Sequence, residues 1–152
     1  MNEDNERNSH SKEHFMRLAL AQAHHALPAC RPNPPVGCVV VRGGQVISTG
    51  YTQPPGAPHA EAMAMAGVNG SGHDLVVFAT LEPCSFEGRT PSCAHTLVQR
   101  GVGTVIVGML DPHPRNRGAG LRILQQAGVR TECGVLATEV ASFLDPYLIR
   151  DD

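Results

Sequence analysis

The sequence of 152 residues has no tryptophan, and only four phenylalanines and two tyrosines provide large aromatic rings. Proteins that bind single-stranded nucleic acid stack bases on such rings and carry a basic patch or stripe. Here 12 lysines and arginines are outnumbered by 14 acidic residues, and the formal net charge is −2. The composition therefore argues against a nucleic-acid-binding protein and favours a small-molecule partner.

The sequence also lacks an apolar run of the roughly 18 residues that a membrane-spanning helix needs. Residues 1–10 are polar and charged, and they lack the apolar segment of a signal peptide. We expect residues 1–10 to form a disordered tail and residues 11–152 to form one domain. The five cysteines are an odd number, which argues against a disulfide framework and favours a reducing, cytoplasmic location.

Hydrophobic periodicity and turn residues predict strands that alternate with helices. The expected helices are 12–27 with Ser11 as its cap, 59–66, 91–100, 118–127 and 138–144, and the expected strands are 36–41, 46–51, 75–80, 102–109 and 129–133. A Gly43-Gly44 pair between the first two strands is typical of a hairpin. Helical crossovers make the remaining strands parallel. The predicted fold class is therefore α/β, a three-layer α/β/α arrangement with a mixed sheet of about five strands.

A histidine, two cysteines and a glutamate have the pattern of a zinc deaminase site. His59 and Glu61 begin a predicted helix, Cys84 follows a predicted strand, and Cys93 falls in the first turn of the next helix. Three protein ligands leave a fourth tetrahedral position for water, which is typical of a catalytic zinc site. Glu61 lies about 200° around the helix from His59, so we expect it to transfer protons rather than to bind metal.

Two other interpretations of these residues stay open, because each element of the pattern is weak alone. The ion could be structural, or the cysteines could be buried small hydrophobic residues with no metal. The combination favours a catalytic Zn²⁺ and the hydrolytic deamination of an amidine-like ring carbon. Cys30, Cys38 and Cys133 are interpreted as structural or incidental thiols.

Longer motifs surround these residues between positions 15 and 150. They are Arg31-Pro32-Asn33-Pro34-Pro35-Val36-Gly37-Cys38, Pro58-His59-Ala60-Glu61, Thr80-Leu81-Glu82-Pro83-Cys84-Ser85, Gly88-Arg89-Thr90-Pro91-Ser92-Cys93 and Asp111-Pro112. Together they resemble the deaminase domain of the riboflavin-biosynthesis deaminase–reductases, here as a stand-alone domain. The resemblance implies the cytidine-deaminase-like fold and the deamination of 2,5-diamino-6-ribosylamino-4(3H)-pyrimidinone 5′-phosphate. It also implies self-association. The family usually continues into a reductase domain, whereas this sequence ends at Asp152, so we expect any reduction step to need a separate protein.

Carried over by position, the resemblance implies a set of metal ligands and a proton shuttle: His59, Cys84 and Cys93, and Glu61. It implies that Asn33 contacts the pyrimidine, that Arg89 lies at the phosphate end of the substrate and that Asp111 lies near the ribose. His113 stands where the family typically has asparagine, and we expect it to contact the substrate as well. Alternatively, Asn33 and Asp111 only form turns beside proline, and Arg89 is a solvated side chain.

The sequence departs from the family pattern, for example at Phe86 and His113, so the identity of the substrate stays open. The first hypothesis is a riboflavin-pathway deaminase. The second is a related deaminase that acts on another aminated pyrimidine, a purine, a pterin or a triazine, with Phe86 and His113 reshaping the pocket. A nucleic-acid-editing deaminase and a non-catalytic zinc protein are the remaining hypotheses.

Overall fold

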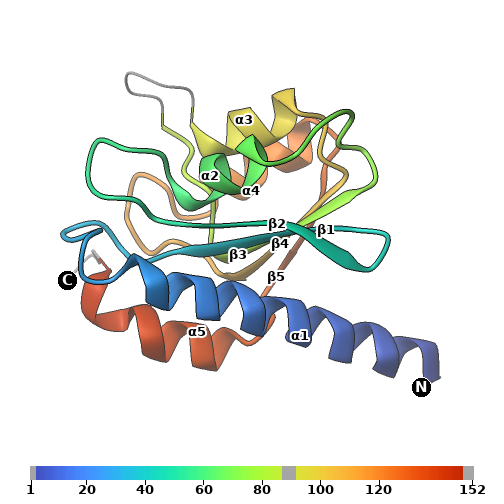
Figure 1. Ribbon diagram of the computed structural model, residues 1–152, viewed down its shortest axis with the longest axis horizontal. Coiled ribbons are helices and arrows are strands. Elements are labelled where there is room, and N and C mark those ends of the chain that lie inside the picture. Colours follow the sequence, from blue (N-terminus) through green and yellow to red (C-terminus); the bar gives the residue numbers. More distant parts are fainter. Residues whose placement is uncertain (1–2, 87–91, 149–152) are drawn as a thin grey trace.

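The computed structural model describes residues 3–86 and 92–148 of the chain, which form a sheet between two layers of helices (Figure 1). The elements in chain order are α1 (Glu3–Ala26), β1 (Gly37–Arg42), β2 (Gln45–Tyr51), α2 (Ala60–Ala66), β3 (Leu75–Leu81), α3 (Cys93–Gln99), β4 (Thr104–Met109), α4 (Ala119–Gln126), β5 (Arg130–Cys133), α5 (Ala137–Leu144) and a short 3₁₀ helix (Asp145–Tyr147). The strand order is β2-β1-β3-β4-β5. Within the sheet, β1 is antiparallel to both of its neighbours, whereas β3, β4 and β5 are parallel.

Both faces of the sheet are buried. Helices α2, α3 and α4 lie on one face, and α1 and α5 lie on the other (Figure 1). Successive side chains of a strand point to opposite faces. In β1, Val40 packs in the core under α2, α3 and α4, whereas Val39 and Val41 pack in the core against α1 and α5. The predicted α/β/α fold class with a mixed five-stranded sheet is therefore confirmed.

The first helix is longer than the sequence predicts. It begins at Glu3, so Ser11 lies inside the helix instead of capping it, and the backbone of residues 3–10 is helical where a disordered tail is expected. From Phe15 and Met16 onward this helix packs against the sheet, and extending a nucleated helix costs far less than starting one. The division into a tail and a domain beginning at residue 11 stays a prediction. The bounds of the other predicted elements agree with the structure to within two residues.

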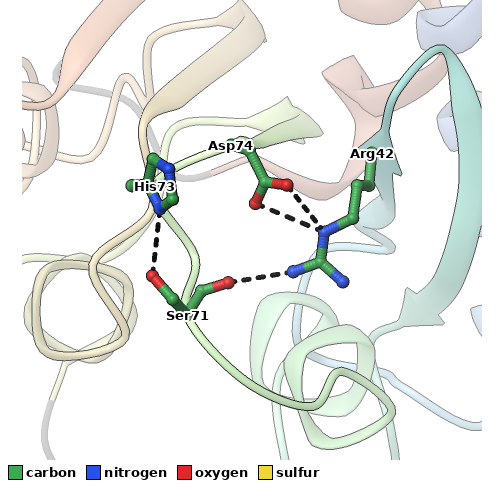
Figure 2. Close-up of polar contacts among 4 residues, drawn as sticks. All are labelled: Arg42, Ser71, His73 and Asp74. Atoms are coloured by element: carbon green, nitrogen blue, oxygen red, sulfur yellow. Dashed lines mark hydrogen bonds and ion pairs between the residues drawn. The ribbon is translucent and has the colours of Figure 1, made fainter.

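A surface cluster closes the loop between α2 and β3 over the end of β1 (Figure 2). The Arg42 guanidinium forms an ion pair with Asp74 at 3.1 Å and donates to the carbonyl oxygen of Ser71 at 2.9 Å. Ser71 Oγ also lies 3.1 Å from His73 Nδ1. Such exposed pairs contribute about 1 kcal/mol or less to stability, so we infer that this cluster mainly fixes the geometry of the loop.

Among the described residues, no helix combines the length and apolar character needed to cross a membrane.

Gly120 allows α4 to approach the segment that follows β3. A methyl group at this position would overlap the carbonyl oxygen of Pro83. We expect Gly120→Ala to lower the free energy of unfolding by about 2 kcal/mol or more, because the clash is with backbone and α4 must move. At Gly43 an added methyl group meets nothing within 4 Å, so Gly43→Ala should cost only about 1 kcal/mol for the left-handed backbone. Urea denaturation tests the pair, and equal losses would contradict the close approach at Gly120.

Candidate active site

Three potential metal ligands come from the ends of three elements. His59 is the residue immediately before α2, Cys84 follows the end of β3, and Cys93 is the first residue of α3. The start of α3 is fixed by Ser92, whose hydroxyl oxygen accepts from the backbone N–H of His95. The backbone N–H of Cys93 donates to Cys84 Sγ at 3.2 Å, so the two cysteines are held together before any ion is considered.

The ligand atoms of these three residues lie within 4.8 Å of one another. His59 Nδ1 lies 3.3 Å from Cys93 Sγ and 3.8 Å from Cys84 Sγ. The histidine is exposed, Cys84 is half-buried and Cys93 is buried. One imidazole and two sulfurs that converge in this way fit the ligand preference of Zn²⁺ with a fourth position left open.

The electrostatics of the cluster favour a thiolate. A hydrogen bond from the Cys93 thiol is the main reason why the pKa of Cys84 is lowered to about 4. The same bond, together with burial, raises the pKa of Cys93. The pKa of His59 is raised, mainly by its hydrogen bond to Cys84. A deprotonated sulfur is the form that binds metal, so Cys84 is ready to act as a ligand at neutral pH.

Glu61 is buried beside this cluster, with only 5% of its surface exposed, in the first turn of α2. It is not part of the group of converging ligand atoms. Burial raises the pKa of Glu61 to about 7, with a further contribution from the negative charge of Cys84. A carboxyl group with such a pKa can both accept and release a proton near neutral pH.

A cavity of about 270 Å³ opens next to the cluster. It is lined by His59, Glu61 and Cys84, and also by the predicted substrate residues Asn33, Asp111 and His113. Asn33 lies in the loop before β1, and the other two lie in the loop between β4 and α4, residues 110–118, which we call the substrate-side loop. The structure therefore brings together every predicted site residue that it describes. Arg89 lies outside the described residues.

Sequence reasoning missed several residues of this cavity. Thr52 lines it, and its hydroxyl oxygen accepts from the backbone N–H of Val36 at 2.9 Å, which fixes the chain leaving the Asn33 loop. Glu82 also lines it with a buried carboxylate. In the sequence it stands directly after an apolar strand and within the 80–85 motif, two residues before Cys84, but neither feature indicates a role for its carboxylate.

One wall of the cavity carries aromatic rings and a cation. Phe86 and His113 both line the cavity, and their ring centroids are 6.1 Å apart. The Arg115 guanidinium lies 4.8 Å from the centroid of the Phe86 ring. Phe86 is 40% exposed, so this wall lies at the mouth of the cavity rather than at its floor.

Comparisons with known proteins show which family most of this chain resembles. Residues 9–109 match the family model described as the cytidine and deoxycytidylate deaminase zinc-binding region. The chain is 41% identical over 140 residues to the riboflavin biosynthesis protein RibD of Escherichia coli, covering 91% of this chain and 38% of that protein.

Solved structures are similar as well. The RibD structure from Acinetobacter baumannii has a TM-score of 0.86 and 35% identity, over 93% of this chain and 40% of that one. A diaminohydroxyphosphoribosylaminopyrimidine deaminase/5-amino-6-(5-phosphoribosylamino)uracil reductase from Thermotoga maritima has a TM-score of 0.85 and 36% identity, over 92% and 41%. The chain thus spans about two fifths of the length of these three relatives. With the His59, Cys84 and Cys93 cluster inside the matched region, the chain belongs to the cytidine and deoxycytidylate deaminase zinc-binding family of hydrolytic deaminases.

Proposed function

We propose that the protein is a zinc-dependent deaminase of riboflavin biosynthesis that acts on 2,5-diamino-6-ribosylamino-4(3H)-pyrimidinone 5′-phosphate. The observation that carries this proposal is the cavity in which His59, Cys84 and Glu61 meet Asn33, Asp111 and His113. A cavity of about 270 Å³ suits a heterocyclic ring with part of its sugar better than a polynucleotide. The Thermotoga maritima relative is named as a diaminohydroxyphosphoribosylaminopyrimidine deaminase, which supports the same substrate for this chain.

His59, Cys84 and Cys93 would hold the zinc ion. Bound zinc supplies Lewis acidity that makes a water molecule nucleophilic at neutral pH. The protein positions the ligands through rigid helix starts, and the lowered pKa of Cys84 keeps that sulfur deprotonated.

Glu61 would transfer the protons of the reaction. Its carboxylate accepts a proton from the attacking water and delivers it to a ring nitrogen of the substrate. A second transfer carries the remaining proton of that water, from the new hydroxyl group on the ring carbon, to the exocyclic amine, which leaves as ammonia while a ring carbonyl forms. Burial of Glu61 keeps bulk water from competing for these protons, and the pKa of about 7 matches both halves of the task.

The opposite side of the cavity would recognise the substrate. The Asn33 amide offers both a donor and an acceptor, which suits the edge of a pyrimidinone. Asp111 and His113 are placed on the substrate-side loop, where a ribose would extend from the ring. Arg89 and Arg115 would supply positive charge for the phosphate.

Arg115 provides a test of phosphate recognition, since its guanidinium lies over Phe86 at the mouth of the cavity. We expect Arg115→Ala to raise KM for the phosphorylated substrate about tenfold, because one charge-assisted hydrogen bond is lost. KM for the dephosphorylated ribosylaminopyrimidinone should stay unchanged. The matched control is Arg117→Ala, which removes an exposed arginine from the same loop. Equal effects of Arg115→Ala on both substrates would contradict a phosphate contact.

A panel of heterocycles tests the proposed function itself. Ammonia release is measured for the ribosylaminopyrimidinone phosphate, its dephosphorylated form, cytidine, deoxycytidylate, guanine, an aminopterin-type pterin and an aminotriazine. We expect turnover of the first compound at the highest kcat/KM. The Phe86–His113 wall supports one second candidate, a related deaminase that takes an unphosphorylated base. Turnover of such a base with an inert phosphate compound would replace the first proposal by the second.

The wider setting of the reaction is also a proposal. The Thermotoga maritima relative carries a reductase name beside its deaminase name, and we propose that a reductase consumes the product of this chain. Self-association and a cytoplasmic location stay predictions.

A further inference from the structure

A buried carboxylate links the two loops that build the cavity. Glu82 follows directly after β3, and only 3% of its surface is exposed. Its oxygens accept hydrogen bonds from three backbone N–H groups, those of Asp111 at 3.1 Å, Gly118 at 3.0 Å and Leu121 at 3.1 Å. All three donors lie 29 to 39 residues further along the chain.

The negative charge of Glu82 is balanced by backbone rather than by a basic side chain. Within the described part of the chain, the ion pairs do not include Glu82. Two of its donors, Gly118 and Leu121, belong to the start of α4, where unpaired N–H groups and the helix dipole favour an anion. Gly118 has a φ of 79°, a left-handed conformation that glycine adopts without strain. The chain can therefore turn its Gly118 N–H toward the carboxylate.

A second buried side chain ties the same two segments together. Asn116 is fully buried, and its Nδ2 donates to the carbonyl oxygen of Pro83 at 3.3 Å and to Asp111 Oδ2 at 3.2 Å. Both partners only accept, so the amide nitrogen must face them. The other oxygen of Asp111 accepts from the backbone N–H of His113 at 3.0 Å.

These contacts fix the position of the substrate-side loop relative to the segment from Glu82 to Cys84. The substrate-side loop carries Asp111 and His113, and Pro83 directly precedes the metal-ligand candidate Cys84. We propose that Glu82 is a positioning residue, assisted by Asn116: its buried carboxylate holds the substrate-side loop in register with the segment that presents Cys84. The proposal rests on the proposed function only for its kinetic consequence.

Amide hydrogen exchange tests, without any substrate, whether Glu82 holds the substrate-side loop. In the zinc-loaded protein, Glu82→Gln should speed exchange at the Leu121 amide by at least about tenfold, because the carboxamide NH₂ meets that N–H instead of an acceptor. Glu82→Ala should do the same at Asp111, Gly118 and Leu121. Amides of β4 should keep their protection in both variants. Glu139→Gln, a replacement of a half-exposed glutamate on α5, is the matched control.

Steady-state kinetics give the second readout, with whichever heterocycle the wild-type enzyme deaminates best. We expect Glu82→Gln and Asn116→Ala to raise KM about tenfold while kcat changes less than about threefold and zinc stays bound, because substrate contacts shift as a unit. A merely structural role would lower the melting temperature without changing KM of the folded, zinc-loaded enzyme. The Asn116→Ala variant keeps the test valid if Glu82→Ala does not fold.

Two results would overturn the proposal. Unchanged exchange at Asp111, Gly118 and Leu121 in the Glu82 variants would show that the carboxylate does not hold the loop. Unchanged KM in zinc-loaded Glu82→Gln would show that the loop position does not matter for substrate binding. A wild-type enzyme inactive on the whole heterocycle panel would instead refute the proposed function. The exchange result would still show whether Glu82 holds the substrate-side loop.

Discussion

Replacing Glu61 with glutamine should lower kcat by about 10³-fold, because the carboxamide keeps the shape of the side chain but cannot carry a proton. Glu61 is buried beside the three potential metal ligands and is not one of them. The zinc content of Glu61→Gln protein should therefore stay at about one ion per chain. Ammonia release and zinc analysis on the same preparation provide the measurement.

The matched control for this variant is Glu132→Gln, which alters a half-buried glutamate on β5 that pairs with Lys12. It makes the same chemical change away from the cavity, and its kcat should equal that of the wild type. Full activity of Glu61→Gln would favour the hypothesis of a non-catalytic zinc protein. Loss of zinc in that variant would show that Glu61 acts as a ligand, contrary to our account.

Replacing Cys84 with alanine should abolish both metal binding and turnover. The cluster has three potential ligands, and Cys84 is the one whose pKa is lowered to about 4. Without this sulfur only two ligands converge, too few for a zinc site of either kind. We expect zinc to fall below about 0.1 ion per chain after dialysis, and activity to fall in proportion. Zinc analysis by mass spectrometry and an ammonia assay measure the two losses.

Cys133→Ala is the matched control, because Cys133 is an exposed free thiol at the end of β5. It should keep both zinc and activity. Retention of a full zinc complement by Cys84→Ala would contradict the assignment of this residue, and zinc loss without loss of turnover would contradict a catalytic role for the metal.

Local patterns in the sequence predict the fold and the metal cluster. Strand and helix periods are local properties, and parallel crossovers follow from their alternation. The cysteines of the cluster stand at the end of a strand and at the start of a helix, and such ends meet at one edge of a sheet. The strand end before Cys84 and the helix start at Cys93 can therefore be recognised from the sequence alone. In the structure, the two cysteines lie together.

The role of Glu82 could not be predicted in this way, because its partners are backbone N–H groups of a distant loop. Every residue except proline has a backbone N–H group, so the sequence does not show which of these groups will face a carboxylate. Asn116 was missed for the same reason, since one of its acceptors is the carbonyl oxygen of Pro83. The helical backbone before residue 10 was missed because helix propagation depends on a neighbouring packed segment, which the composition of residues 1–10 does not reveal.

X-ray absorption at the zinc edge of the purified native protein tests the central claim most directly. Our account predicts one zinc ion with two sulfur ligands at about 2.3 Å, one imidazole nitrogen at about 2.0 Å and a light atom in the fourth position. The spectrum should be the same for Glu61→Gln protein. A native protein without zinc, or a coordination shell that changes when Glu61 is replaced, would contradict the claim that His59, Cys84 and Cys93 alone hold the metal.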